Sequence, residues 1–326
     1  MSCQVSIIIP TFNRASLIVA TLQRIQEQTF TSWECLIVDD GSTDTTLETV
    51  GRFIAQDSRF ALYSRPESLL KGSNSCRNFG FEKAQGAWVH FFDSDDVLEP
   101  TFYETLLTGD LAGIQMVAGS YFVTDSHLQK REAVSLTLKS TLFRDYVLWR
   151  LKLITGCVIF RKSFLLQQTF PLFHPDLHRG QETELFSRLF FQLEPSAYRI
   201  YDFPLFLYRQ HPDSKTAQHQ TYLPLYKQSQ FWVLQQIRTL SQSLQDSELN
   251  RHFFNTLTVL FFDAVTHRDL ALAPAVLREM ISLLKSYSHV KSLEVFVLGH
   301  LVLWFQRPVY RLRKRWLHFY PDTHEK

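Results

Sequence analysis

The chain has 326 residues, of which 45 % are hydrophobic and 20 % charged, values typical of a globular protein with one or two domains. A formal net charge of +2 gives no strong overall field and argues against a nucleic-acid partner. The 4 cysteines lie far apart without a Cys-x-x-Cys spacing, so we expect neither a zinc site nor a disulfide framework.

No targeting segment is evident in the sequence. The N-terminal residues run into an apolar, strand-like stretch without the basic and apolar regions of a signal peptide. The most apolar window, residues 295–305, contains His300 and is shorter than the roughly 20 residues that span a bilayer. We therefore expect a cytoplasmic protein.

Strand and helix patterns alternate over the first hundred residues. β-Rich apolar runs predict strands at residues 5–10, 33–38, 60–64 and 87–92. Helical periodicity and capping residues predict helices at 14–28, 42–55 and 73–84. This order predicts an α/β fold with a doubly wound, mostly parallel sheet and right-handed crossovers.

The second half of the chain changes character. Further strands are expected at residues 114–123, 155–160 and 199–208, with a helix at 182–192. Long helical patterns follow at 222–244, 247–266, 273–287 and 291–305. We place a boundary in the polar run near residue 218, giving a domain over residues 1–218 and a helical region over 219–326.

Polar clusters follow the predicted strands or open the next helix. They are PTFNR (residues 10–14), VDDGSTD (38–44), CRNFG (76–80) and DSDD (93–96). Ligands bind at the carboxyl edge of such sheets, so all four clusters could line one crevice. The adjacent carboxylates Asp93, Asp95 and Asp96 repel one another unless water or a cation separates them. The alternative is a solvated turn followed by a capped helix.

The usual glycine-rich nucleotide motifs are missing from the sequence. A Mg²⁺ or Mn²⁺ ion held by Asp93 and Asp95 could bind a diphosphate instead. Asp39 and Asp40 either bond a base or ribose hydroxyl or form a turn before a capped helix. Arg77 pairs either with a diphosphate or with a surface acid.

These segments, with VSIIIPTFNR at the start and YRQHPDSKT at residues 208–216, resemble a family 2 glycosyltransferase with a GT-A fold over residues 4–216. The resemblance implies an inverting enzyme whose DxD motif, Asp93-Ser94-Asp95, binds a divalent ion and a nucleotide sugar, usually of uridine. The donor-binding residues that it implies are Pro10, Thr11, Asn13, Asp39, Asp40, Arg77, Asp93, Ser94, Arg209 and His211.

The resemblance also implies a catalytic base. The family usually carries a Glu-Asp pair at the start of a helix, whereas this chain has Gln181-Glu182. Glu182 is therefore the expected base, and its alternative role is that of a first-turn acid complementing the helix dipole. Glu184 is expected to be solvated. The alternative for His211 is a turn residue before Pro212.

The C-terminal segment, residues 301–320, alternates bulky aromatic and basic residues. It either lies in the headgroup plane of an anionic membrane or packs as a helix with a solvated basic face. The membrane alternative would place the protein on the inner face of the cell membrane and would suit a lipid-linked acceptor.

Three functions are compatible with these sequence features. We favour an inverting glycosyltransferase that uses a UDP-sugar and a glycan or lipid-linked acceptor in surface polysaccharide synthesis. The loss of the Glu-Asp pair suggests a catalytically silent, nucleotide-sugar-binding subunit instead, but the intact DxD motif argues against it. A nucleotidyltransferase would need a glycine-rich loop after the first strand, and PTFNR contains no glycine.

Overall fold

The computed structural model describes residues 4–129, 131–210 and 221–319. It divides the chain into two compact units, the first comprising Met1–Asp176 and Leu189–Gln218 and the second Leu177–Arg188 and His219–Lys326. Leu177–Arg188, which the sequence analysis placed in the first domain, thus groups by its contacts with the C-terminal helices. The division into folding domains at residue 218 stays a prediction.

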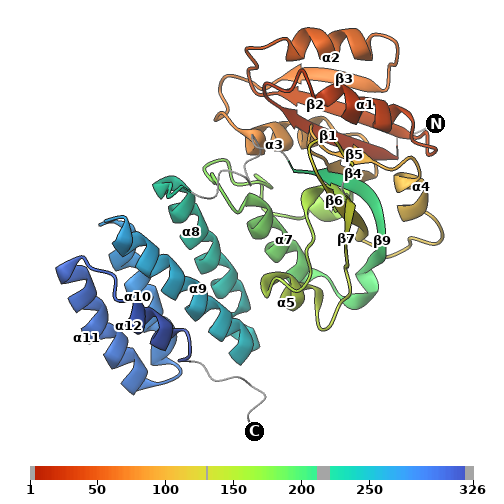
Figure 1. Cartoon of the computed structure of the whole chain (residues 1–326). Coiled ribbons are helices and arrows are strands. Elements are labelled where there is room, and N and C mark those ends of the chain that lie inside the picture. The colour runs from red at the N-terminus through yellow and green to blue at the C-terminus, as the bar shows by residue number, and fades with distance from the viewer. Residues whose placement is uncertain (1–3, 130, 211–220, 320–326) are drawn as a thin grey trace. The chain divides into compact units, whose positions relative to one another are not determined.

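Nine strands of the described residues form one sheet in the first unit (Figure 1). Their order is β3-β2-β1-β4-β8-β6-β9-β5, and β7 pairs with β6. The strands are β1 (Val5–Thr11), β2 (Trp33–Asp39), β3 (Phe60–Ser64), β4 (Trp88–Phe91), β5 (Val97–Leu98), β6 (Met116–Thr124), β7 (Arg131–Val134), β8 (Val158–Arg161) and β9 (Tyr198–Arg209).

The half of the sheet formed by β3, β2, β1 and β4 is parallel. Every residue of β1 and β4 is buried, as expected for strands covered on both faces. Helices α1 (Ile18–Gln26) and α2 (Thr46–Ile54) lie on one face and α3 (Ser73–Lys83) on the other (Figure 1). The predicted doubly wound α/β arrangement is confirmed here.

Beyond β4 the sheet is mixed. Strand β8 is antiparallel to both β4 and β6, whereas β6 and β9 run parallel. Strands β6, β8 and β9 overlap the segments expected at 114–123, 155–160 and 199–208, although residues 155–157 form a 3₁₀ turn, and parallel pairing is confined mainly to the first half. Short elements that the periodicity did not predict are β5, β7, α4 (Phe102–Leu106), α5 (Leu142–Val147) and α6 (Lys162–Leu165).

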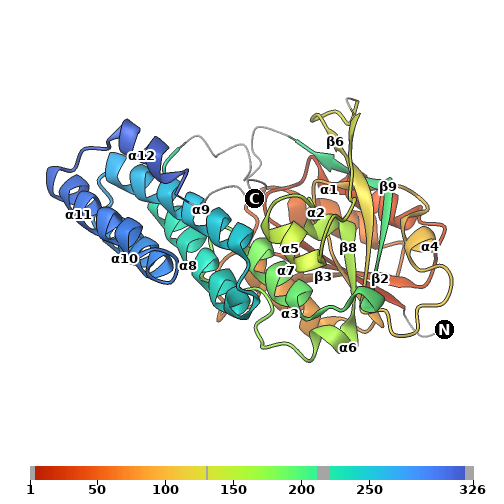
Figure 2. The same ribbon diagram turned by 90° about the horizontal axis from the view of Figure 1, so that it is seen from below.

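The second unit is helical, as predicted for the C-terminal region. Its elements are the first part of α7 (Gln181–Gln192), then α8 (Pro224–Ser241), α9 (Ser247–Thr266), α10 (Leu272–Lys285), α11 (His289–Phe305) and α12 (Tyr310–Trp316). Helices α8 to α11 pack each on the next, and α12 packs on α9 (Figure 2). Gly299 allows α10 and α11 to approach closely, because a Cβ atom there would collide with Leu277. None of the described helices is both long and apolar enough to cross a membrane.

Candidate active site

The carboxyl ends of β1, β2 and β4 meet at one edge of the parallel half of the sheet. Thr11 lies opposite Asp39 in the register, and the Asp40 backbone N–H donates to the Thr11 carbonyl at 2.9 Å. The Phe92 N–H donates to the Ile8 carbonyl at 3.0 Å, so the chain leaves β4 beside β1 and enters the DSDD segment. The predicted convergence of three of the polar clusters at this edge follows directly from the parallel register.

Asp39 shapes the loop after β2. Its Oδ2 accepts hydrogen bonds from the backbone N–H groups of Gly41 and Ser42, each at 2.9 Å, and its Oδ1 accepts one from Ser42 Oγ at 2.5 Å. Gly41 has a φ of 83°, in the left-handed region that favours glycine. Asp39 is therefore engaged in building the turn, one of the two roles considered for it, and its nucleotide contact stays a prediction.

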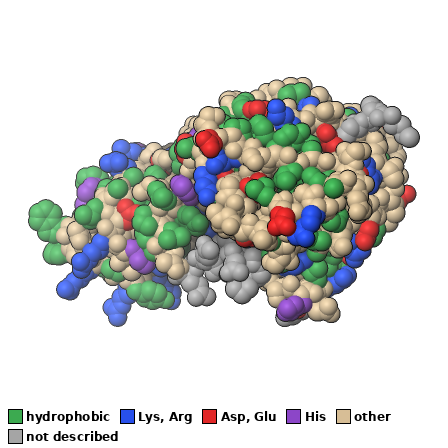
Figure 3. Space-filling model, turned by 90° about the horizontal axis from the view of Figure 1, so that it is seen from above, with side chains coloured by type: hydrophobic (Ala, Val, Ile, Leu, Met, Phe, Trp, Pro, Cys, Tyr) green, Lys and Arg blue, Asp and Glu red, His purple; other side chains and the backbone are tan. Residues whose placement is uncertain are grey.

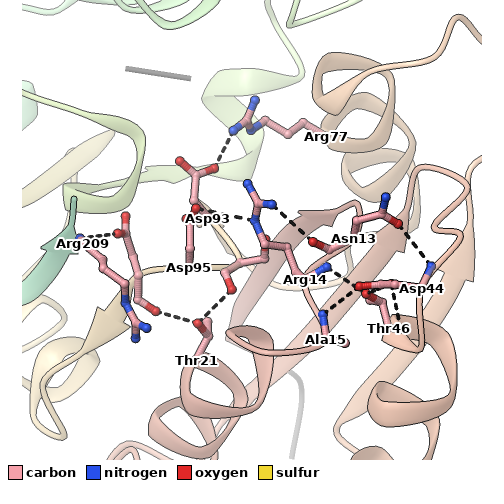
Figure 4. Close-up of polar contacts among 12 residues, drawn as sticks. Asn13, Arg14, Ala15, Thr21, Asp44, Thr46, Arg77, Asp93, Asp95 and Arg209 are labelled. Carbon is pink, nitrogen blue, oxygen red and sulfur yellow. Dashed lines mark hydrogen bonds and ion pairs between the residues drawn. The ribbon is translucent and has the colours of Figure 1, made fainter. Parts of the chain in front are cut away.

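Asn13 ties the loop after β1 to the loop after β2 (Figure 4). Its side-chain Oδ1 accepts from the Thr43 N–H at 2.8 Å, and its own N–H donates to Ser42 Oγ at 2.9 Å. Its backbone φ is 51°, a conformation that asparagine tolerates better than most residues. These contacts give Asn13 a positioning role, and direct contact with a nucleotide remains a prediction.

Asp40 is held by a residue that the sequence analysis did not single out. Arg65 Nε donates to Asp40 Oδ1 at 2.6 Å, and the Gly72 N–H donates to the same oxygen at 3.0 Å. Asp40 is 7 % exposed, so this ion pair is largely screened from water. Arg65 follows β3 without any motif around it, and only its contact with Asp40 reveals the link.

Two arginines accompany the carboxylates of the DxD motif (Figure 4). Arg77 of α3 donates from Nη2 to Asp93 Oδ1 at 2.6 Å. Arg14 Nε lies 3.7 Å from Asp95 Oδ2. Arg14 belongs to the PTFNR cluster, but its pairing with Asp95 was not predicted. The arginines offset part of the repulsion between the neighbouring carboxylates.

Asp96, the third carboxylate of the segment, is buried behind the other two. Its Oδ1 accepts a hydrogen bond from the Arg209 N–H at 2.9 Å. Burial, together with the charges of Asp95 and Asp93, raises the pKa of Asp96 well above its usual value. Thr21 of α1 donates to the carbonyls of Ser94 and Asp96, at 3.1 and 2.7 Å, and so fixes the backbone of the segment.

Several donors at this edge are buried without an acceptor. Arg77 is 5 % exposed, yet its Nε and Nη1 make no hydrogen bond within the described part of the chain. The same holds for Arg209 Nε and Thr11 Oγ1. An unsatisfied buried donor costs about 1–3 kcal/mol, and more when it is charged. This arrangement is expected of a site that binds an anionic ligand with hydrogen-bond acceptors.

The first turn of α7 contains Glu182, which is half-buried. Glu184, two residues later, forms an ion pair with Arg188, with 2.9 Å between Oε1 and Nε. The Glu184 side chain is 11 % exposed, so it is engaged by Arg188 rather than solvated as expected from the sequence. Of the remaining predicted residues, Pro10 lies in β1 opposite Val38, and His211 falls outside the described residues.

A sequence model for the family described as Glycosyl transferase family 2 matches residues 6–170. The chain is a member of this family. That span includes nearly all of β1, the loop after β2, Arg77 of α3, and the DxD motif. Membership of the family confirms the resemblance noted in the sequence.

Related proteins fall into the same class. A stretch of 93 residues is 38 % identical to the Escherichia coli UDP-Glc:alpha-D-GlcNAc-diphosphoundecaprenol beta-1,3-glucosyltransferase WfgD, covering 28 % of this chain and 35 % of that protein. The chain spans about half the length, or less, of the curated relatives it matches.

Two groups of solved structures share the fold. Staphylococcus aureus TarS 1–349 in complex with UDP-GlcNAc superposes with a TM-score of 0.58 at 17 % identity, over 94 % of this chain and 93 % of that chain. Glucosyl-3-phosphoglycerate synthase from Mycobacterium tuberculosis, in complex with Mn²⁺, UDP and glucosyl-3-phosphoglycerate, gives a TM-score of 0.51 at 21 % identity, over 72 % and 80 %. A GT-A-type fold for this glycosyltransferase is thereby confirmed.

Metal binding by this glycosyltransferase was predicted at Asp93 and Asp95. No group of three or more His, Cys, Asp or Glu side chains in the described residues could hold a metal ion. Asp93 and Asp95 can nevertheless supply the one or two carboxylates that Mg²⁺ uses when substrate phosphates complete its coordination. The residues therefore fit a divalent ion only in company with a diphosphate.

Proposed function

We propose that this chain is an inverting glycosyltransferase that moves a sugar from a UDP-sugar to a hydroxyl group of a glycan or lipid-linked acceptor in surface polysaccharide synthesis. The observation that carries the proposal is Arg77, a buried guanidinium with two nitrogens that lack acceptors, beside a carboxylate of the DxD motif. The name of the E. coli relative, which includes UDP-Glc and diphosphoundecaprenol, supports a uridine carrier and a lipid-linked acceptor.

In this proposal the buried donors bind the diphosphate. Arg77 donates from Nε and Nη1, and Arg209 from Nε, because charged hydrogen bonds to phosphate oxygens satisfy these groups best. His211 would add a donor from the segment after β9. Thr11, Asn13, Asp39 and Asp40 would surround the nucleoside, with the loop shape that Asp39 and Asn13 maintain.

Asp93 and Asp95 would hold Mg²⁺ or Mn²⁺ together with the donor diphosphate, with Ser94 between them. When bound, such an ion supplies Lewis-acid stabilisation of the negative charge on the leaving group. Arg77 contributes in the same direction, because its guanidinium is fixed by α3 and needs no reorganisation as charge develops.

The proposed reaction is a single displacement. The acceptor oxygen forms a bond to the anomeric carbon while the bond from that carbon to the diphosphate oxygen breaks, and UDP leaves with the electron pair. Glu182 takes the proton of the acceptor hydroxyl. The ion pair of Glu184 with Arg188 favours Glu182 for this role, because the Glu184 carboxylate is already engaged by the Arg188 guanidinium.

Gln181 in place of the usual acid keeps one alternative open, a catalytically silent subunit that binds the nucleotide sugar. Both functions require donor binding, but only the enzyme releases UDP from the donor. Calorimetric titration with UDP, in Mn²⁺ and then in EDTA, tests the shared step.

UDP release from UDP-glucose, UDP-galactose and their N-acetylated forms, with a polyprenyl-diphosphate sugar as acceptor, tests the catalytic step. Binding that Mn²⁺ strengthens, followed by UDP release, supports the enzyme. Binding without release from any donor favours the silent subunit. A folded protein that does not bind UDP in either condition would contradict the donor assignment.

A further inference from the structure

Helix α11 presents apolar side chains on two sides. One stripe faces the helical unit and is buried, and it consists of Ser292, Val295, Gly299 and Val302. A second stripe, spaced three or four residues apart, is exposed and consists of Val290, Leu293, Val297, Leu301 and Trp304. Val290 is 78 % exposed and Trp304 82 %. A helix whose outward stripe is apolar has a face that no described residue covers.

The exposed stripe borders a groove between α11 and α12. The groove has a volume of about 670 Å³ and is lined by apolar side chains that include Leu301, Phe305 and Leu312. Arg307, Arg311 and Arg315 also line it. A lining that combines apolar side chains with three arginines fits a molecule with a hydrocarbon part and an anionic part.

The charge of this surface has one sign. Residues 289–319 contain Lys291, five further basic residues beyond Gln306, and a single acid, Glu294. Arg315 Nη2 donates to Glu294 Oε2 at 2.5 Å, and Trp316 Nε1 donates to its other oxygen at 3.4 Å. Glu294 is thereby neutralised. On the helical unit, Figure 3 shows hydrophobic side chains next to lysine and arginine side chains.

We propose that the α11–α12 surface docks on an anionic lipid bilayer. The exposed stripe of α11 would enter the boundary between headgroups and acyl chains, and the basic side chains of α12 would bind lipid phosphates. Charge decides between a bilayer and a second copy of the chain. Two copies would bring like-charged arginines together, whereas an anionic bilayer complements them.

The proposed docking surface includes the described part of the basic, aromatic segment 301–320 together with the outward face of α11. Docking rests on the proposed function only in giving the enzyme a reason to meet a lipid-linked acceptor on the inner face of the membrane. Membrane attachment itself is measured without donor or acceptor.

Flotation of the full chain with vesicles tests the docking. We expect binding to vesicles of equimolar phosphatidylcholine and phosphatidylglycerol, weakened by salt, and little binding to phosphatidylcholine alone. The triple variant Arg307→Gln, Arg311→Gln, Lys314→Gln leaves the Arg315–Glu294 pair intact. It should bind the mixed vesicles about 100-fold more weakly, at roughly fivefold per charge.

Two further variants separate charge from apolar contact. The matched control Arg268→Gln, Arg278→Gln, Lys285→Gln removes the same charge from exposed positions elsewhere in the helical unit and should bind nearly as tightly as the parent chain. Trp304→Ser keeps every charge and should weaken binding about tenfold. Circular dichroism verifies the fold of each variant.

Equal losses of vesicle binding in the two triple variants would overturn the inference. Equal binding to vesicles with and without phosphatidylglycerol would also overturn it. Concentration-dependent dimers without vesicle binding, detected by light scattering, would assign the stripe to a second copy instead. UDP titration of the same samples keeps the two proposals apart. Variants that lose vesicle binding should retain UDP binding, and a parent chain that binds vesicles but not UDP would contradict only the donor assignment.

Discussion

Replacing Arg77 with methionine tests whether its buried guanidinium exists for a ligand. In the protein without donor, Nε and Nη1 have no acceptors in the described residues, and Nη2 bonds Asp93, whose side chain is 37 % exposed. Methionine fills similar space without charge. The variant loses the bond to Asp93, which water can replace, and it also loses two unsatisfied donors.

The expected result combines a large loss of function with little loss of stability. Two charged hydrogen bonds to a diphosphate are worth about 1.5–3 kcal/mol each, so UDP should bind about 100-fold to 10,000-fold more weakly. The free energy of unfolding should change by less than about 1 kcal/mol. The stabilisation lost with the bond to Asp93 is similar in size to the cost of the unsatisfied donors that the substitution removes. Calorimetry with UDP and urea unfolding measure the two quantities.

Arg59→Met is the matched control within the same unit. Arg59 donates to Asp57 from Nε and Nη2, at 3.0 and 2.7 Å, and lies 3.8 Å from the centre of the Trp33 ring. Hydrogen bonds from Arg59 lower the pKa of Asp57 to about 2. We expect this control to lose up to about 2 kcal/mol of stability and to bind UDP normally.

If Arg77→Met binds UDP as tightly as the parent chain, the guanidinium does not bind the diphosphate. If Arg77→Met destabilises the protein as much as Arg59→Met does, Arg77 serves the fold and not a ligand.

Further predictions concern the base, the ion and a buried histidine. Glu182→Gln should lower the rate of UDP release about 100-fold with unchanged UDP affinity, whereas Glu184→Gln should keep most of the rate. The reverse result would assign the catalytic base to Glu184. Asp95→Asn should bind UDP with the same affinity in Mn²⁺ and in EDTA. If Mn²⁺ still strengthens UDP binding in this variant, Asp95 is not a ligand of the ion. Burial lowers the pKa of His90 from 6.5 to about 3. The unfolded chain therefore binds a proton first, and stability should fall as the pH drops from 6.5 towards 3, by up to about 1.4 kcal/mol per pH unit. Urea unfolding at stepped pH should show this loss in the parent but not in His90→Gln, and identical slopes would refute it.

His90 also illustrates what packing adds to a sequence. Its Nε2 lies 3.1 Å from the Gly156 carbonyl oxygen, which can only accept, so Nε2 carries the proton and Nδ1 accepts from the Tyr103 hydroxyl at 2.8 Å. His90 lies in β4, and its partners come from the 3₁₀ turn before β8 and from α4. No local pattern around His90 reveals them.

The sequence by itself determined the α/β alternation, the four polar clusters and the family. Strand and helix periodicities are local, and parallel strands must end at a common edge, so the convergence of Thr11, Asp39 and Asp93 could be predicted. The roles of Glu182 and His211 rest on the resemblance alone and stay predictions.

Only the tertiary structure decided which charges pair. Arg65 with Asp40, Arg77 with Asp93 and Arg14 with Asp95 join residues far apart in the chain, and their distances depend on how helices and loops pack on the sheet. The sequence also did not predict that β8 pairs antiparallel with β4. A buried apolar strand has the same residue pattern whether its neighbour runs parallel or antiparallel. The buried donors of Arg77 have no acceptor, and the apolar stripe of α11 is exposed. Both features depend on how the elements pack. These side chains can be found in the sequence, but only the tertiary structure shows that the Arg77 donors have no acceptor and that the α11 stripe is exposed.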